Sequence, residues 1–157
     1  MSSIKDIADQ YQASTDYFQS LLSGVNSETV DIKYPGEWSA RQVIHHMADS
    51  EAQSYARLRR LIAEPEGSII QGYDESAWAN NSVLGYNELA IEIPLAVLFA
   101  VRAASHSLLL RISESDLKRF GVHSEAGEYS LARWIETYTR HPREHGSQLE
   151  RALRGEK

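Results

Sequence analysis

The sequence predicts an all-α protein: one four-helix bundle whose helices are joined by long connections. Four long segments carry apolar residues at helical spacing, the segments between them are longer than a bundle needs, and no segment shows a convincing strand alternation. With 157 residues, 42% of them hydrophobic and 24% charged, the chain is long enough to bury one core. We therefore expect a single domain over residues 1–157.

The first two helices are predicted from their periodicity and their end signals. The first runs from about Ser3 to Leu22, and Gly24 follows it as a stop. The second starts at Ser39, which can cap the first turn while Gln42 bonds back to the capping residue. We expect the second helix to continue until Glu64-Pro65 ends it, and Trp38 to pack onto Val43.

The third predicted helix spans roughly Asn87 to Ile112, and its Pro94 is tolerated if it lies in the first turns. The fourth starts after Ser130 and runs to about Leu153. Its apolar stripe reads Leu131, Trp134, Ile135, Tyr138, His141, His145 and Leu149. Across the bundle we expect burial of Trp38, Val43, Met47, Leu98, Leu108, Trp134 and Tyr138.

Three connections, at residues 23–37, 65–86 and 113–129, are long enough to be functional covers or flexible links. The middle one contains Ile69, Ile70, Tyr73, Trp78 and Tyr86, which make it too apolar for a solvated linker. We therefore expect it to pack over one end of the bundle.

Composition excludes several classes of function. A net charge of −6 and a pI near 5.5 argue against nucleic-acid binding, which needs a basic face. Without cysteine, metal chemistry depends on histidine and carboxylate. The polar N-terminus has no signal core, and the apolar segment 91–101 is too short to span a bilayer. We expect a cytoplasmic protein that does not bind membranes.

Three histidines are the candidate metal ligands. His141 and His145 lie four residues apart on the apolar stripe of the fourth helix, so both rings can approach one ion. His46 shares a face of the second helix with Val43 and Ser50, whereas His45 points about 100° away. Together the three would leave open coordination positions, as in catalytic zinc sites. Core histidines without a metal remain the alternative.

Pro142 lies between the two histidines of the fourth helix. Proline has no amide to bond the carbonyl of Tyr138 and crowds that carbonyl. We expect the helix to kink or restart there, leaving the Tyr138 carbonyl free for a water or another donor.

The run GEWSARQVIHHMADSEAQSYARLRRLIAEPEGSIIQGYDESAW, with the C-terminal His-x-x-x-His, resembles the DinB/YfiT-like superfamily, and its YfiT-like branch most closely. The resemblance implies an up-down-down-up bundle in which His46, His141 and His145 hold a divalent metal, commonly nickel or zinc. It also implies chemistry with low-molecular-weight thiols, because members described as enzymes are metal-dependent thiol S-transferases or isomerases. Many members have no known reaction. The chain departs from close relatives at Glu51 and Glu144, where those often carry histidine.

These observations predict a metal-dependent enzyme that activates a thiol, as an S-transferase, or water, as a hydrolase. Its partner would be a small thiol or an electrophile. Glu144 is a candidate general base or an ordinary solvated residue. Arg57 could bind an anionic group or pair with Glu64. The candidates for the substrate pocket are Arg57, Tyr55, Tyr138 and Trp78.

Alternatives remain at this point. The bundle could bind a metal or a small ligand in a stress response without catalysis, or could be a metal-free interaction domain. The string His141-Pro142-Arg143-Glu144-His145 matches a zinc-peptidase motif, but only twelve residues follow it, too few for that fold. His106, expected with Arg102 on the polar side of its helix, and His123 are expected at the surface. The apolar outer faces of the first and third predicted helices indicate a homodimer.

Overall fold

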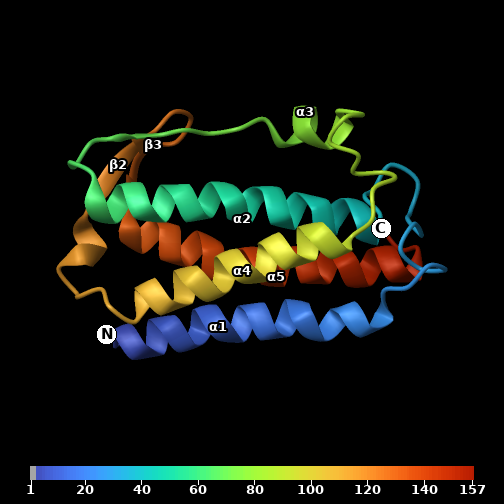
Figure 1. Ribbon diagram of the computed structural model, residues 1–157, viewed down its shortest axis with the longest axis horizontal. Coiled ribbons are helices and arrows are strands. Elements are labelled where there is room, and N and C mark those ends of the chain that lie inside the picture. The colour runs from blue at the N-terminus through green and yellow to red at the C-terminus, as the bar shows by residue number, and fades with distance from the viewer. Residues whose placement is uncertain (1–2) are drawn as a thin grey trace.

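The computed structural model describes residues 3–157 and confirms the four-helix bundle. In Figure 1, the first and last long helices run in one direction and the two middle ones in the other, which is the predicted up-down-down-up order. The four long helices are α1 (Ile4–Leu21), α2 (Ala40–Ala63), α4 (Glu92–Leu109) and α5 (Leu131–Arg154). A short helix, α3 (Glu75–Asn80), and two 3-10 turns (Leu22–Gly24 and Asp116–Lys118) lie in the connections.

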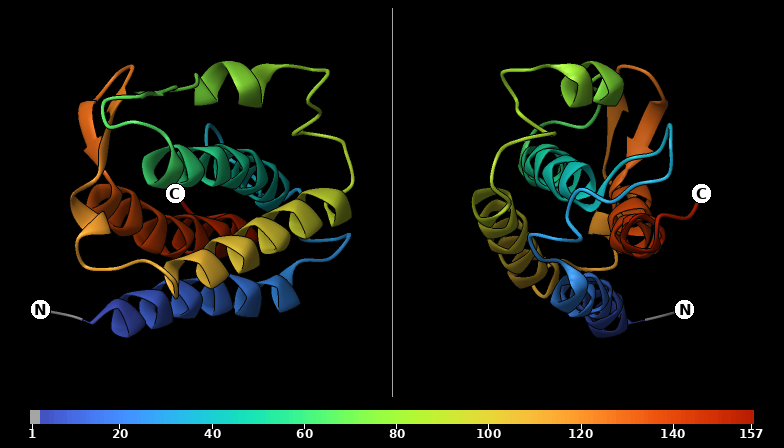
Figure 2. Two further views of the ribbon diagram at one scale, coloured as in Figure 1. Left: turned by 60° about the vertical axis from the view of Figure 1, so that its left-hand side comes forward. Right: turned by 90° about the vertical axis from the view of Figure 1, so that its right-hand side faces the viewer.

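The connection between α2 and α4 runs back along the bundle. Because these two helices are parallel, the chain must return along their length before α4 begins, and Figures 1 and 2 show this segment, with α3, lying outside α2. The expectation that it covers one end is therefore wrong. The parallel order of the helices dictates a lengthwise cover.

Three short strands form a small sheet that the sequence did not predict: β1 (Ile69–Ile70), β2 (Phe120–His123) and β3 (Gly127–Ser130). β1 pairs in parallel with β2, and β2 pairs antiparallel with β3. Strands of two and four residues are too short to show a clear alternation of apolar and polar residues in the sequence. The sheet ties the start of the return segment to the residues that lead into α5.

The helix ends follow the predicted local signals, with one exception. Ser39 and Gln42 form the predicted capping box of α2. Ser130 caps α5, and Gly155, at a φ of 64°, follows its last turn in the left-handed conformation that favours glycine. α4, however, begins at Glu92 and not near Asn87, so Pro94 falls in its first turn, where a missing amide costs little.

The predicted core is confirmed in most positions. Val43, Met47, Leu98, Trp134 and Tyr138 are buried, whereas Trp38 and Leu108 are only partly buried. The apolar residues divide into two clusters, one toward each end of the bundle. Between them along the helices lies a group of buried polar side chains.

Arg102 is the centre of this polar group, contrary to the expectation that it lies on the polar side of its helix. Only 1% of it is exposed. Its guanidinium donates to the Glu51 carboxylate at 2.8 Å and to the Tyr138 carbonyl at 3.0 Å. Three further bonds reach acceptors on α1: Tyr11 O, Ser14 Oγ and Thr15 Oγ1. One side chain of α4 thereby bonds to the other three long helices.

This network explains how α5 accommodates Pro142. The helix continues through the proline without restarting. The Tyr138 carbonyl, which the residue 142 amide would otherwise bond, accepts from Arg102 instead. The predicted free carbonyl is confirmed, and its donor is a buried side chain.

α4 is apolar and long enough to cross a membrane by length and composition alone. In the bundle it packs against α1 and α2. Apolar helices inside soluble proteins have the same composition, so this property does not by itself indicate a membrane segment.

Replacing Arg102 tests the polar network. Arg102→Met leaves the buried Glu51 carboxylate unpaired, and we expect a loss of about 3–5 kcal/mol in the free energy of unfolding, measured by urea titration. The control, Arg140→Met, breaks an exposed pair with Glu144 and should cost no more than about 1 kcal/mol. Equal losses in the two variants would contradict the central role of Arg102.

Candidate metal centre

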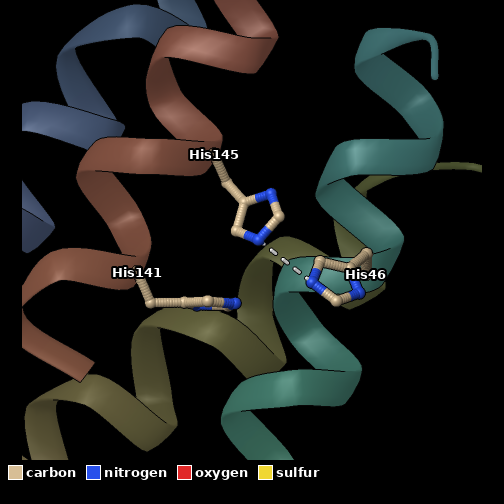
Figure 3. A group of neighbouring side chains, drawn as sticks. All are labelled: His46, His141 and His145. Atoms are coloured by element: carbon tan, nitrogen blue, oxygen red, sulfur yellow. Dashed lines mark hydrogen bonds between the residues drawn. The ribbon is translucent and has the colours of Figure 1, made fainter. Parts of the chain in front are cut away.

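The structure brings His46, His141 and His145 together in the bundle. Figure 3 shows one ring from α2 facing two rings from successive turns of α5. One nitrogen of each ring lies within 4.8 Å of the others, and the Nε2 atoms of His46 and His145 are 3.2 Å apart. Zinc with bonds of about 2.0–2.1 Å in a tetrahedral site holds ligand nitrogens about 3.3 Å apart. The three side chains therefore fit one divalent ion with little rearrangement.

Burial keeps the three rings neutral. Burial, with a smaller contribution from His145, lowers the pKa of His46 to about 3. Burial also lowers the pKa of His141 well below its ordinary value, and lowers that of His145. Neutral imidazole offers a lone pair to a metal, whereas imidazolium does not. The site is thus ready for a cation at neutral pH without first losing protons.

Each histidine of α5 has a polar neighbour behind its ring. His145 Nδ1 is 2.8 Å from Gln148 Oε1, an acceptor that fixes the proton on Nδ1 and leaves the Nε2 lone pair free. His141 Nδ1 is buried without a hydrogen-bond partner among the described residues and lies 3.9 Å from Glu51 Oε1. His46 Nδ1 is also buried and lacks a partner in the described chain.

Glu51 links the histidines to the polar network. Its carboxylate is fully buried and accepts from Arg102 and from the Ser54 hydroxyl, each at 2.8 Å. A carboxylate behind a ligating imidazole orients the ring and strengthens it as a ligand. Glu51 Oε1 lies 3.9 Å from His141 Nδ1, too far for a hydrogen bond but on the side of the ring where such a carboxylate would act. The sequence singled out this position only as a departure from the family pattern.

A surface hollow of about 240 Å³ opens beside His145. Its walls include Trp38, whose ring packs on His46, and the carboxylate residues Glu37 and Glu75. Sequence reasoning did not identify either acid as a site residue. Both belong to connections whose path depends on distant pairing, although Glu75 belongs to a cluster that the family resemblance includes.

The predicted pocket residues have mixed outcomes. Arg57 donates to the Tyr138 hydroxyl and to the Gln71 carbonyl, both at 2.9 Å, and it is Arg60 that pairs with Glu64. The Tyr138 ring lies 5.9 Å from that of His141. Trp78 packs on Tyr73, and Tyr55, which is 37% exposed, lies under Arg59. Tyr138 therefore lies next to His141, Arg57 contacts Tyr138 through its hydroxyl, and Tyr55 lies at the surface.

The remaining candidates lie outside the histidine group. Glu144 pairs with Arg140 at 2.9 Å and is 58% exposed, as the solvated alternative predicted. His45 is buried against Tyr86, with Nε2 3.2 Å from the Leu89 carbonyl. His106 is half-buried, and His123 is half-buried on β2.

Metal analysis of histidine variants tests the centre. Purified protein is expected to carry about one divalent ion per chain, and His46→Ala, His141→Ala and His145→Ala should each lower it sharply because each removes a lone pair. His45→Ala, His106→Ala and His123→Ala are the controls and should keep the metal. Equal metal content in wild type and His141→Ala would contradict the assignment.

Glu51→Gln tests the carboxylate behind His141. The amide preserves the shape but loses the charge, so we expect divalent-metal affinity to fall about 10–100-fold in a competition titration with a chelating dye. Glu144→Gln removes an exposed carboxylate one residue from His145 and should leave the affinity unchanged. An unaltered affinity in Glu51→Gln would show that this carboxylate does not act on the site.

Comparison with known proteins identifies one family and relatives that share one name. The family model described as DinB superfamily matches residues 10–149. A protein of Oceanobacillus iheyensis is 40% identical over 77% of this chain and 69% of its own, and one of Bacillus mycoides is 30% identical over 82% and 72%. Both bear the name "putative metal-dependent hydrolase". YfiT from Bacillus subtilis, described as "a probable metal-dependent hydrolase with an unusual four-helix bundle topology", is 23% identical and superposes with a TM-score of 0.86 over 98% of this chain and 89% of its own. The chain belongs to the DinB superfamily.

Proposed function

We propose that the protein is a metal-dependent hydrolase in which His46, His141 and His145 hold one divalent cation. The observation that carries the proposal is the convergence of three neutral imidazoles, one buried and two partly buried, beside an open hollow. The names of the relatives support the same reaction class. Imidazole ligands suit zinc and nickel, so we expect one of these ions.

A divalent ion bound by three neutral histidines lowers the pKa of water in an open position and polarises a substrate oxygen. The protein's own residues orient the ligands, exclude solvent and accept the proton. Gln148 orients His145 through a hydrogen bond, the Glu51 carboxylate lies 3.9 Å behind the His141 ring, and Trp38 packs on His46 to exclude solvent from one side. Glu75, in the wall of the hollow, is the proposed proton acceptor during attack by water.

The charge of the hollow favours hydrolysis over thiol transfer. The hollow is lined by Gly36, Glu37, Trp38, Glu75, His145 and Gln148, a set with two carboxylates and no lysine or arginine. An acidic entrance attracts cationic substrates, admits neutral ones, and repels the carboxylates of common low-molecular-weight thiols. Thiol S-transfer remains the second candidate because the same metal site would also stabilise a thiolate.

Chromogenic ester, amide and phosphoester substrates test the hydrolase with zinc-loaded and nickel-loaded protein. We expect turnover of at least one class, its loss in His145→Ala, and a decrease of about 100-fold or more in Glu75→Gln, because a general base contributes that much. Glu144→Gln is the control and should retain full activity.

A second measurement separates hydrolysis from thiol transfer. In cobalt-substituted protein, thiolate binding gives intense charge-transfer absorption, so a panel of small thiols is expected to leave the visible spectrum unchanged. A new band, with faster conjugation of an electrophile in wild type than in His145→Ala, would replace the hydrolase with an S-transferase.

A further inference from the structure

A second hollow lies between α2, the end of the return segment and the first turns of α4. It measures about 440 Å³, within the range of about 300–1,000 Å³ that is usual for small-molecule sites. Figure 1 shows the return segment passing beside α2 here before it leads into α4. None of the three candidate metal ligands lines this hollow, so it is distinct from the hollow beside His145.

Apolar side chains form most of the wall of the second hollow. Leu84, Leu89, Ile93 and Val97 line it, and each of them is exposed, Ile93 by 74%. Large apolar side chains that gather at one exposed place commonly mark a binding site. A concave wall of this kind suits the apolar body of a small molecule.

One carboxylate in this wall has an unused oxygen. Asp49 lies on the α2 side of the hollow, and its Oδ2 accepts from the Tyr86 hydroxyl at 2.5 Å. Burial and the bond to Asp49 raise the pKa of Tyr86, so the phenol keeps its proton and remains the donor. Within residues 3–157, Asp49 Oδ1 has no hydrogen-bond donor and Asp49 has no ion pair.

The charge of Asp49 is not balanced inside the hollow. No lysine or arginine is among the residues that line it. Arg41 donates to the Leu89 carbonyl nearby, but its own charge is matched by Asp31 at 2.7 Å. A carboxylate among apolar groups is costly without a cation or a full set of donors. A ligand that carries a positive charge would supply both.

The wall is held in place before any ligand binds. The Leu89 carbonyl accepts from Arg41 Nη1 at 2.9 Å and lies 3.2 Å from His45 Nε2, which must carry a proton because a carbonyl only accepts. The ring of Tyr86 stacks on that of His45, with centroids 5.5 Å apart. These contacts attach the return segment to α2 on both sides of the hollow, as is usual for preformed ligand sites.

We infer that the second hollow binds a small organic cation, a protonated amine on an apolar body, whose nitrogen donates to Asp49 Oδ1. The apolar body packs against the side chains of the return segment and α4, and the ammonium group lies against α2. The inference uses neither the three candidate metal ligands nor the proposed hydrolase activity.

The same chemistry disfavours the other classes of small molecule. An anion such as a fatty acid would bring a second negative charge to Asp49 with no positive side chain in the wall. A neutral apolar molecule would bury Oδ1 without a donor. An alcohol can donate to Oδ1, but a hydrogen bond between two charged groups is stronger.

Calorimetric titration tests the ligand class. At least one of benzylamine, phenethylamine and tryptamine is expected to bind wild type about tenfold or more tightly than the alcohol of the same skeleton, because the ammonium bonds to a carboxylate more strongly. Phenylacetate should bind more weakly than either. Equal affinities for amine and alcohol, or no binding of any amine, would overturn the inference.

Asp49→Asn tests the carboxylate. The amide oxygen can still accept from the Tyr86 hydroxyl, but the charge is lost, so amine affinity should fall about tenfold while alcohol affinity stays the same. Glu88→Gln removes an exposed carboxylate of the same return segment that does not line the hollow, and this matched control should bind the amine as wild type does. Unchanged amine affinity in Asp49→Asn would reject the site.

Three further variants separate this hollow from the one beside His145. Ala90→Trp, at an exposed position of the wall, should fill the second hollow and abolish amine binding, with folding checked by circular dichroism. Glu75→Gln and His145→Ala alter the other hollow and should leave amine binding unchanged. In wild type, the amide shifts that an amine causes in NMR spectra should concentrate at residues 45–49 and 84–97. Binding that is lost in Glu75→Gln, or shifts concentrated around His145, would place the cation at the metal centre and overturn the inference.

Discussion

A buried guanidinium at the centre of the bundle is the constraint on which the rest of the structure depends. Arg102 cannot leave its hydrogen bonds unsatisfied in a core, and it finds acceptors on all three other long helices. Such networks often add less stability than apolar packing would, but they restrict the ways in which helices can be arranged. Here the network fixes the positions of the two helices that carry the histidines, because Glu51 lies on the helix of His46 and Tyr138 lies one turn before His141.

Arg102 supplies the hydrogen bond to α5 that Pro142 cannot make. A proline inside a helix costs about 3 kcal/mol, partly because the carbonyl four residues earlier loses its donor. In α5 that carbonyl belongs to Tyr138, and Arg102 from α4 supplies the missing bond at 3.0 Å. The proline also prevents the backbone of α5 from competing with the guanidinium for this acceptor. A residue that breaks a helix in isolation thereby attaches two helices to each other directly beside a candidate metal ligand.

The features that the sequence predicted are those that depend on neighbours in the chain. The capping box at Ser39, the end of α2 before Pro65, and the shared face of His141 and His145 all follow from spacings of three or four residues. Three other features depend on distant partners and were missed: the burial of Arg102, the pairing of β1 with β2, and the positions of Glu37 and Glu75. The candidate metal ligands could be named because His46 lies on a helix face that faces the core, whereas the walls of the hollow come from connections whose course only the folded chain determines.

The distribution of charge around the histidines follows from the same network. Glu51 has its charge matched by Arg102, so this pair adds almost no net charge beneath the three neutral rings. A cation held by those rings would keep its full charge inside the bundle, and the carboxylates of Glu37 and Glu75 lie in the wall of the hollow. In the proposed hydrolase, this separation would place the electrophilic cation inside the bundle and a proton acceptor outside it, in the hollow. An unpaired carboxylate at the position of Glu51 would reduce the effective charge of the cation, so the buried arginine supports the packing of the helices and, under the proposed function, would also support the reactivity of the site.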